Sequence, residues 1–350
     1  MRCSNHMREL ITCLVGFDEV SIRRREFIVL VSGAAAGWPV LARGQQDVRV
    51  RRVGFLSGRA QSDLEGQSSI RDSVQRLQEL GWTNGGNVQF DFRFGEADAT
   101  RISMLATELV EVGPDVILAS GAVAAIALRQ HTLSIPIVFV EVVDPVAAGF
   151  VTNLARPEGN ITGISNSEFS VGGKWLQLLK ECAPSVDRIA VVFDPANPTW
   201  TAYLRTIEAA APSFGLRLIP ASVRDTAEIA QRIAIFARDS NGALVVLPGP
   251  VVNRHREAIV VAAARYRLPA IYPFRYFTAD GGLMSYGPDF ADLYRRGASY
   301  VDRILRGAKV AELPVQQPTK YELTINVKTA KALAVIIPPS VLAIADEVIE

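Results

Sequence analysis

The chain has 350 residues, and its 37 lysines and arginines are almost matched by 36 aspartates and glutamates. This balance argues against a basic surface for nucleic acid or for an anionic membrane. A chain of this length, with 49% hydrophobic residues, can bury a large core and favours two domains.

Residues 1–44 contain the parts of an export signal in their usual order. Three arginines, Arg23 to Arg25, precede an uncharged run over residues 27–41, and Ala42 and Gly44 provide small residues for signal cleavage. The arginine pair, followed by one residue and a phenylalanine, resembles a twin-arginine leader. We therefore expect a periplasmic protein that begins at Gln45.

Two alternatives concern this leader. A membrane anchor would need about 20 apolar residues, and the run over residues 27–41 is shorter and contains Pro39. The general secretory route stays open beside the twin-arginine route. Because Asp18 and Glu19 stand before the arginines, we interpret residues 1–20 as a start site placed too early, with the true start near Val20.

Removing the leader changes the composition that the fold must explain. It leaves 31 basic and 32 acidic residues, Cys182 as the last cysteine, and His131 and His255 as the last histidines. An intramolecular disulfide is then impossible, and neither a histidine-rich metal site nor a Ser-His-Asp triad is expected.

After residue 52, apolar strand patterns alternate with amphipathic helix patterns, as in parallel βαβ units. The first series predicts strands at 53–57, 88–93, 116–119 and 137–142, with helices at 63–80 and 99–112. Asp98 is the expected N-cap of the second helix. The second series predicts strands at 189–193, 216–221, 243–247 and 270–272, with helices at 172–181, 199–214, 227–237 and 253–266.

The expected fold class is α/β, with two doubly wound lobes of parallel sheet joined by a hinge of several chain crossings. Lobe 1 takes residues 45–163 and about 287–312, where a helix at 290–305 returns, and lobe 2 takes residues 164–286. Crossings near 163–168 and 283–289 would form the hinge. A strand at 321–327 and two short helices lie in residues 313–350, which the sequence assigns to neither lobe.

Ligands of open parallel sheets bind beyond the carboxyl ends of the strands, so the residues there are candidates for a binding site. The ligand-binding candidates are Ser57, Gly58, Ser120, Gly121, Ala122, Asp144, Asp194, Asn197, Pro248 and Tyr272. Hinge or cleft candidates are Ser165, Glu168, Phe169 and Tyr286. Several have an ordinary alternative: a helix cap at Ser120, Asp-Pro turns at Asp144 and Asp194, an Asn-Pro turn at Asn197, and core packing for the aromatic residues between 272 and 286.

Motifs of catalysis are absent from the sequence. Strand one is followed by Ser57-Gly58-Arg59 in place of a Gly-x-Gly-x-x-Gly loop, and no P-loop, His-Glu-x-x-His or Gly-x-Ser-x-Gly motif occurs. We therefore predict a binding protein that is not an enzyme, with no catalytic residues, no cofactor and no metal.

Several segments resemble one family, the periplasmic substrate-binding components of ABC transporters related to the tryptophan/tyrosine-binding type. The matching segments are Leu80-Gly81-Trp82, Pro136-Ile137-Val138-Phe139, Asp144-Pro145-Val146, Gly159-Asn160-Ile161-Thr162-Gly163, Gly172-Gly173-Lys174-Trp175-Leu176, Gly281-Gly282-Leu283-Met284-Ser285-Tyr286-Gly287 and Leu313-Pro314-Val315-Gln316-Gln317-Pro318. Together they cover essentially the whole chain after the leader.

The resemblance implies a type 1 periplasmic binding protein fold. It also implies a protein that captures an aromatic or hydrophobic amino acid, or a related acid, for a membrane permease with a separate ATPase. We expect the protein to be a monomer. By position, Ser120, Gly121 and Ala122 would take the ligand carboxylate and Asp144 or Asp194 the ammonium, with Asn197 and Tyr272 completing the site. Arg59 and Gly249 match no ligand-specific pattern, so the identity of the ligand stays open.

Two other functions fit the same sequence. One is a ligand-binding partner of a sensor receptor. A histidine kinase gene next to the gene for this protein would favour that function, whereas neighbouring permease and ATPase genes would favour transport. The other is an exported enzyme that uses Asp144 and Asp194 as an acid/base pair.

Overall fold

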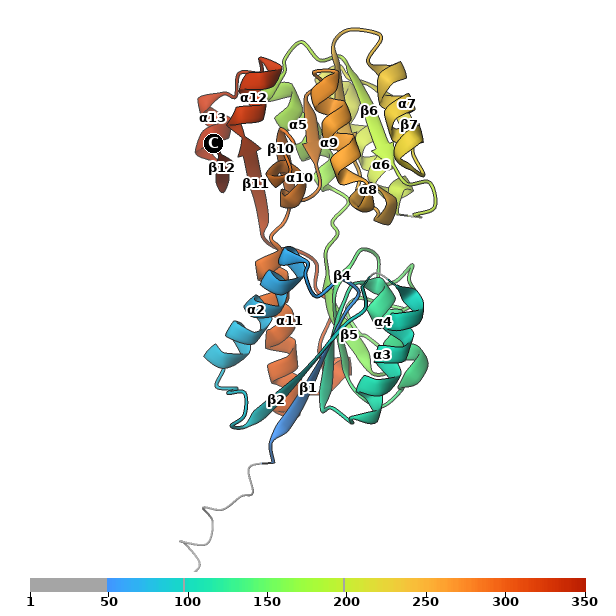
Figure 1. The fold of residues 1–350 in the computed structure, drawn as a ribbon, viewed down its shortest axis with the longest axis vertical. Coiled ribbons are helices and arrows are strands. Elements are labelled where there is room, and N and C mark those ends of the chain that lie inside the picture. Colours follow the sequence, from blue (N-terminus) through green and yellow to red (C-terminus); the bar gives the residue numbers. More distant parts are fainter. Residues whose placement is uncertain (1–48, 97, 198) are drawn as a thin grey trace, which may run out of the picture. The chain divides into compact units, whose positions relative to one another are not determined.

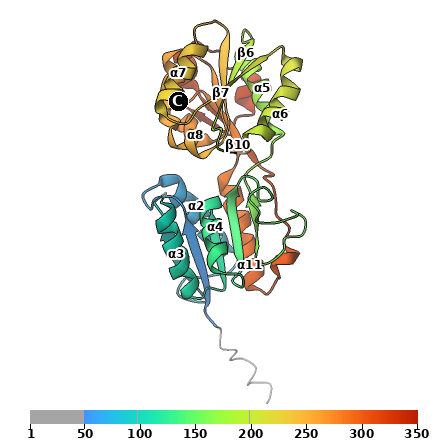
Figure 2. The same cartoon turned by 90° about the vertical axis from the view of Figure 1, so that its right-hand side faces the viewer.

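The computed structural model describes residues 49–350, except for residues 97 and 198. The leader predicted over residues 1–44 lies outside this part. From Val50 onward the chain builds two separate sheets with helices on both faces of each (Figures 1 and 2). The protein therefore has the two doubly wound α/β lobes that the alternating pattern predicts.

Sheet A consists of five parallel strands in the order β2-β1-β3-β4-β5. Their bounds are β1 (Arg51–Ser57), β2 (Val88–Phe94), β3 (Val116–Ser120), β4 (Ile137–Val142) and β5 (Ile161–Ser165). Strands β3 and β5 are buried along their whole length, because helices cover both faces of a doubly wound sheet.

Four helices cover sheet A. One face carries α3 (Ala99–Glu111) and α4 (Ala122–His131), and the other carries α2 (Leu64–Glu79) and α11 (Phe290–Leu305), as Figure 1 shows. Asp63 caps α2 by accepting the Gly66 N–H at 2.7 Å, and Asp98 caps α3 as predicted. Helix α11 packs on β3, β4 and β5, so a segment from the end of the chain completes this lobe.

Sheet B has seven strands in the order β12-β11-β10-β9-β8-β6-β7. Their bounds are β6 (Arg188–Phe193), β7 (Arg217–Ser222), β8 (Gly242–Val246), β9 (Ala270–Tyr272), β10 (Met284–Pro288), β11 (Tyr321–Asn326) and β12 (Glu347–Ile349). All neighbours are parallel except β10 and β11, which run antiparallel.

The helices of the second lobe pack on both faces of sheet B. Their bounds are α5 (Val171–Cys182), α6 (Trp200–Ala210), η2 (Ala211–Phe214), α7 (Thr226–Phe236), α8 (Pro250–Arg254), α9 (Arg256–Arg265), α10 (Arg275–Ala279), α12 (Val327–Leu333) and α13 (Pro339–Ala343). Trp175 of α5 is 2% exposed and donates its indole N–H to the Tyr286 carbonyl at 2.7 Å. Cys182 is buried as a free thiol.

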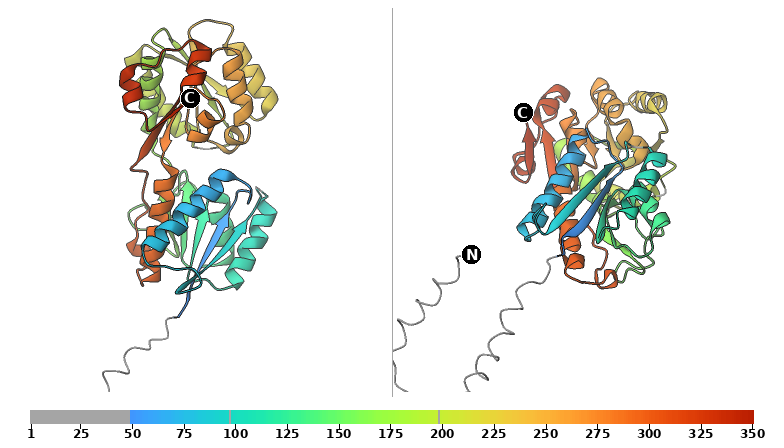
Figure 3. Two further views of the ribbon diagram at one scale, coloured as in Figure 1. Left: turned by 60° about the vertical axis from the view of Figure 1, so that its left-hand side comes forward. Right: turned by 60° about the horizontal axis from the view of Figure 1, so that its bottom comes forward.

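The last residues, which the sequence assigned to neither lobe, divide between the two. Residues near the 3₁₀ helix η3 (Val310–Glu312) bind sheet A, because Gln316 donates its N–H to the Gly163 carbonyl at 3.1 Å. Strands β11 and β12 then join sheet B, and Figure 3 shows the red C-terminal segment within that lobe. The chain thus passes between the lobes three times, after β5, after β10 and before β11.

The differences from the sequence prediction include a divided helix and an additional strand. The helix expected over 253–266 is interrupted at His255, whose backbone leaves the helical region (φ −104°, ψ 24°), and forms α8 and α9. Strand β5 was not predicted, because Gly163 at its centre weakens any strand pattern. In the structure that glycine is required, since a Cβ there would lie 2.0 Å from the Phe139 carbonyl oxygen.

Within the described residues, no helix combines the length and the hydrophobicity that crossing a membrane requires.

Replacing Gly163 tests this close approach. Gly163→Ala should lower the free energy of unfolding by about 1–3 kcal/mol, because the added methyl group forces β4 and β5 apart. Gly173→Ala in α5 is the matched control: its Cβ would lie 3.6 Å from the Ala210 Cβ, an ordinary contact, and alanine favours a helix. Denaturant unfolding of both variants measures the difference. Equal unfolding midpoints for the two variants would contradict the conclusion that the close approach of β4 and β5 requires glycine at position 163.

A second test concerns Glu322 in β11, which is paired with Gly287 of β10. Burial, and then the negative charge of Asp289, raise the pKa of Glu322 from 4.5 to about 7, with Arg275 acting in the opposite direction. Between these two pH values the folded state holds more protons than the unfolded state, so stability falls as the pH rises.

Glu322→Gln removes this ionisation. Above pH 7 the variant should be more stable than the wild type by on the order of 2 kcal/mol, and the difference should disappear as the pH falls to about 4. Unfolding curves across this pH range measure the difference, with Glu312→Gln at an exposed position as the control for losing one carboxylate. A difference that stays constant with pH would contradict the prediction.

Candidate functional site

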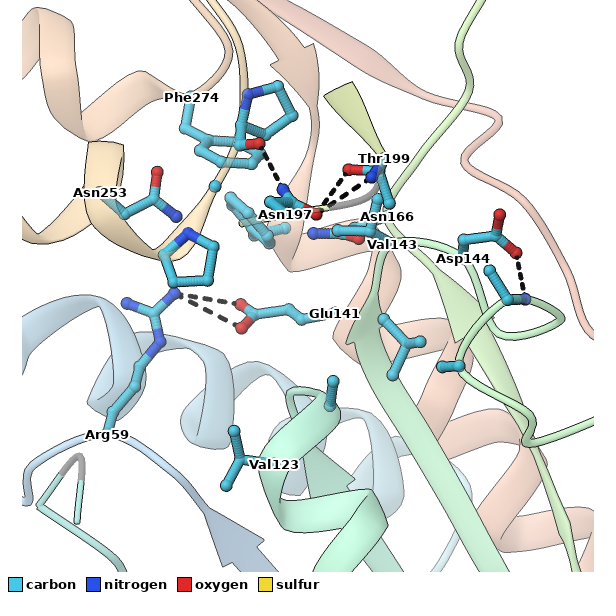
Figure 4. A pocket seen from close by; sticks show the side chains of 18 of the residues that line it. Arg59, Val123, Glu141, Val143, Asp144, Asn166, Asn197, Thr199, Asn253 and Phe274 are labelled. Carbon is cyan, nitrogen blue, oxygen red and sulfur yellow. Dashed lines mark hydrogen bonds and ion pairs between the residues drawn. The ribbon is translucent and has the colours of Figure 1, made fainter. Parts of the chain in front are cut away.

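A cavity of about 380 Å³ opens at the carboxyl ends of the strands of both sheets (Figure 4). Its volume is typical of small-molecule sites, which measure ~300–1,000 Å³. The side of sheet A contributes Arg59, Ala122, Val123, Glu141, Val142, Val143, Asp144, Ala147, Ala148, Asn166 and Phe290. The side of sheet B contributes Asn197, Thr199, Pro248, Gly249, Pro250, Asn253, Phe274 and Tyr276.

An arginine and a glutamate face each other across one end of the cavity, as Figure 4 shows. Both carboxylate oxygens of Glu141 lie 3.4 Å from Nη2 of Arg59, and the side chains are 10% and 28% exposed. Arg59 follows β1, where the Ser57 hydroxyl accepts its backbone N–H at 3.1 Å and shapes the turn. The cavity therefore contains one positive and one negative group side by side.

The backbone of Glu141 has an unusual conformation. Its φ of 62° is in the left-handed region, which non-glycine residues seldom occupy. The pairing of β4 with β5 shifts register between Val140 and Val142, so Glu141 is an inserted residue in the ladder. This bulge leaves both valines buried and directs the glutamate side chain into the cavity.

The pair dominates the electrostatics of its surroundings. The charge of Glu141 raises the pKa of the Arg59 guanidinium although burial acts in the opposite direction. Burial raises the pKa of Tyr276 and of Tyr294, and the charge of Glu141 adds to both increases. All three groups keep their protons at physiological pH, so the two that line the cavity, Arg59 and Tyr276, contribute a stable cation and a neutral phenol to its wall.

Three asparagines supply amides to the cavity, and two of them have unused hydrogen-bonding capacity. Asn197 is satisfied, because it donates to the Pro248 carbonyl at 3.0 Å and accepts from the Thr199 hydroxyl at 2.9 Å. Asn166 is 9% exposed, and its Oδ1 has no partner among the described residues. The buried Oδ1 of Asn253 is likewise unpaired there. Unpaired buried amides are costly, which suits groups that a ligand completes.

Aromatic rings form an apolar part of the cavity wall. The ring of Phe274 lies 5.3 Å from that of Phe290 and 5.4 Å from that of Tyr276, measured between centroids. All three side chains line the cavity. Such a wall can stack on a flat apolar group of a ligand.

Of the ligand-binding candidates from the sequence, Ala122, Asp144, Asn197 and Pro248 line the cavity. Ala122 starts α4, whose first-turn N–H groups have no carbonyl partner within the helix. Asp144 accepts the N–H groups of Val146 and Ala147 at 3.1 and 2.9 Å, which is the role of a turn cap. The Asp-Pro turn considered for Asp144 is thus present at the cavity wall.

The other ligand-binding candidates do not belong to the lining. Ser57 shapes the turn at Arg59 and Gly58 follows it, while Gly121 (φ 87°) turns the chain into α4. Ser120 is 7% exposed, with its hydroxyl 2.5 Å from that of Tyr294, because strand alternation directs it toward α11.

Asp194 and Tyr272 are also outside the lining, for different reasons. Asp194 is 5% exposed and accepts the Ala196 N–H at 2.9 Å, so the Asp-Pro turn alternative describes its environment. Tyr272 is 1% exposed and stacks on Phe277 with centroids 5.1 Å apart, so core packing describes it. Of the aromatic residues between 272 and 286, Phe274 and Tyr276 line the cavity.

The hinge or cleft candidates lie at the crossings. Ser165 donates its hydroxyl to the Val143 carbonyl at 3.1 Å, and Glu168 accepts the Tyr321 hydroxyl at 3.0 Å. Tyr286 stacks on Tyr321 with centroids 5.5 Å apart, which ties two crossings together. Phe169 packs edge-on against a ring of the second lobe.

Sequence reasoning missed Arg59, Glu141, Asn166 and Asn253 as cavity residues. Glu141 had a signal, because it is a charged residue inside an otherwise apolar strand at the ligand edge of the sheet. Asn166 follows β5, a strand that was not predicted, so it was not recognised as a strand-end residue. Asn253 lies within a helix, where position relative to strand ends offers no guide.

No group of three or more His, Cys, Asp or Glu side chains in the described part of the chain is arranged to hold a metal ion.

The chain is similar to known proteins in both sequence and fold. A family model described as "ABC transporter substrate binding protein" matches residues 64–349. The chain belongs to this family. Its members are solute-binding proteins that work with ABC transporters, and the fold is that of the type 1 periplasmic binding proteins.

Three relatives illustrate the similarity. A protein of Clostridioides difficile named "Tyrosine-binding protein" is 26% identical over 268 residues, which is 74% of each chain. A Streptococcus pneumonia ABC domain solved in complex with L-Trp is 25% identical, with a TM-score of 0.75 over 85% of this chain and 99% of that one. A conserved domain protein from Vibrio cholerae is 27% identical, with a TM-score of 0.74 over the same shares.

The side-chain amide of Asn197 is hydrogen-bonded through both its nitrogen and its oxygen, and the amide oxygen of Asn166 has no partner among the described residues, so replacing each residue should have a different effect on the stability of the ligand-free protein. Asn166→Leu removes an amide oxygen without a partner, so the variant should be at least as stable as the wild type. Asn197→Leu deletes hydrogen bonds to Pro248 and Thr199 and should lose about 1–3 kcal/mol. Denaturant unfolding of the ligand-free variants measures both, and a large loss for Asn166→Leu would show that its amide has a structural partner.

Proposed function

We propose that the protein is a periplasmic solute-binding protein, exported through a cleaved twin-arginine-like signal. It captures an aromatic or hydrophobic amino acid, or a related acid, in the cavity between the strand ends. The monomer then delivers this ligand to an ABC permease that works with a separate ATPase. Binding and delivery need neither a cofactor nor a catalytic residue.

The observation that supports this proposal most strongly is the composition of the cavity. Three aromatic side chains, Phe274, Tyr276 and Phe290, line the same cavity as the charged groups of Arg59 and Glu141. A ligand that combines a flat apolar group with charged groups matches this lining. The names of two relatives, a tyrosine-binding protein and a domain in complex with L-Trp, are in keeping with such a ligand.

The connections between the lobes support a mechanism of closure. Three crossings give the lobes a common hinge, and residues of both lobes line the cavity. A ligand that contacts both lobes stabilises the closed arrangement by its differential affinity for it. Arg275 of α10 and Glu65 of α2, which lie 3.8 Å apart, already connect the two lobes by an ion pair. We infer that closure around the ligand creates the surface that the permease recognises.

The proposal predicts stabilisation by aromatic amino acids. L-tryptophan or L-tyrosine at a hundredfold excess over Kd should stabilise the full-length protein by about 2.7 kcal/mol, whereas a neutral sugar should not. Thermal denaturation measures the shift, and small-angle scattering should show a smaller radius of gyration for the liganded protein. If no amino acid, aromatic acid or small peptide shifts the transition, the proposal fails.

Two substitutions on α4 test whether the cavity is the site. Val123 lines the cavity and is 49% exposed, whereas Ile126 on the same helix is 44% exposed and outside the lining. Val123→Trp should fill the cavity and abolish the ligand-induced shift. Ile126→Trp adds the same side chain outside the cavity and should retain it. Equal ligand binding by both variants would locate the ligand elsewhere.

A further inference from the structure

The Arg59–Glu141 pair is built in a way that leaves hydrogen-bonding capacity for a third group. Its oxygen-to-nitrogen distances of 3.4 Å exceed the ~2.7–2.9 Å of a tight charge-assisted bond. The other terminal nitrogen of Arg59 is also 3.4 Å from its acidic neighbour, Asp63. A carboxylate accepts up to about four hydrogen bonds, so Glu141, which also interacts with the Tyr294 hydroxyl, can accept a further bond in the cavity that it lines (Figure 4).

Glu141 differs in this respect from the other carboxylates considered for the site. Asp144 lines the cavity, but its Oδ1 is occupied by two backbone N–H groups. Asp194 is buried behind the lining and caps its own turn. Glu141 is the carboxylate whose backbone is held in an unusual conformation that directs it into the cavity. Residues in such conformations cluster at ligand sites.

The combination of the two charges determines which ligands fit. Arg59 alone would attract any organic anion. With Glu141 beside it, an anion that lacks a positive group is repelled by the second charge, whereas a zwitterion satisfies both. The nearby apolar side chains strengthen this discrimination, because charges interact more strongly away from water.

On these grounds we propose that Glu141 binds the α-ammonium group of the ligand while Arg59 binds its α-carboxylate. The cavity thereby selects a free aromatic amino acid over the corresponding acid without an amino group. This inference rests on the proposed function and narrows its ligand class. It assigns the ammonium site to Glu141 in place of Asp144 and Asp194.

The test compares L-tryptophan with indole-3-propionate, which lacks only the amino group. Wild-type protein should bind L-tryptophan roughly tenfold to a hundredfold more tightly, the usual value of a hydrogen bond between charged groups. Glu141→Gln should weaken L-tryptophan binding by a similar factor. It should leave indole-3-propionate binding unchanged or tighter, because the repelling charge is gone. Titration calorimetry of the full-length protein measures all four affinities.

The control is Glu108→Gln, which removes another arginine-paired glutamate in the same lobe. Glu108 lies 3.6 Å from Arg93 and outside the cavity, so this variant should retain the wild-type affinity ratio. If Glu141→Gln does not fold, as judged by circular dichroism, Glu141→Asp withdraws the carboxylate by one methylene and should reduce the ratio.

The possible failures separate the two proposals. Equal wild-type affinities for the two ligands, or a Glu141 variant that weakens both equally, would overturn the inference and leave the proposed function standing. A wild-type protein that binds neither these ligands nor any other amino acid, aromatic acid or small peptide would overturn the proposed function and the inference together.

Discussion

The parallel pairing of the strands is the constraint on which the binding site depends. Parallel strands need a crossover for every connection, so the carboxyl ends of all parallel strands lie at the same end of their sheet. At that end, sheet A carries Arg59 after β1 and Asn166 after β5, and sheet B carries Asn197 after β6 and Pro248 after β8. Residues far apart in the chain therefore line one cavity without any local motif.

The same end is where the structure tolerates groups that a core would exclude. The amide oxygen of Asn166 is buried without a partner among the described residues, Glu141 has a left-handed backbone, and its ion pair with Arg59 is loose. Buried polar groups are almost always satisfied elsewhere in proteins. These three features lie at one cavity that aromatic residues also line, where a ligand with charged groups would complete the missing interactions.

Strand ends in the sequence located the correct edge of each sheet, but they did not determine which side chains face the cavity. Ser120 and Tyr272 both end strands, yet the pleat directs Ser120 toward Tyr294 of α11 and Tyr272 into the core with Phe277. The reverse holds for Glu141, which a one-residue bulge turns into the cavity. The register shift that produces this bulge does not follow from local pattern.

The sequence by itself determined the α/β class, the two lobes and most of the helices, because burial on both faces imposes apolar strands and caps such as Asp63 and Asp98 are local. It also indicated a binding protein through the absence of catalytic motifs, and its segments resembled the family to which the chain belongs. Only the tertiary structure decided that β11 and β12 complete sheet B, and that Arg59, Glu141 and Asn166 meet in one cavity. Both features depend on contacts between segments that are distant in the sequence, and a local sequence pattern does not show which distant segments come into contact.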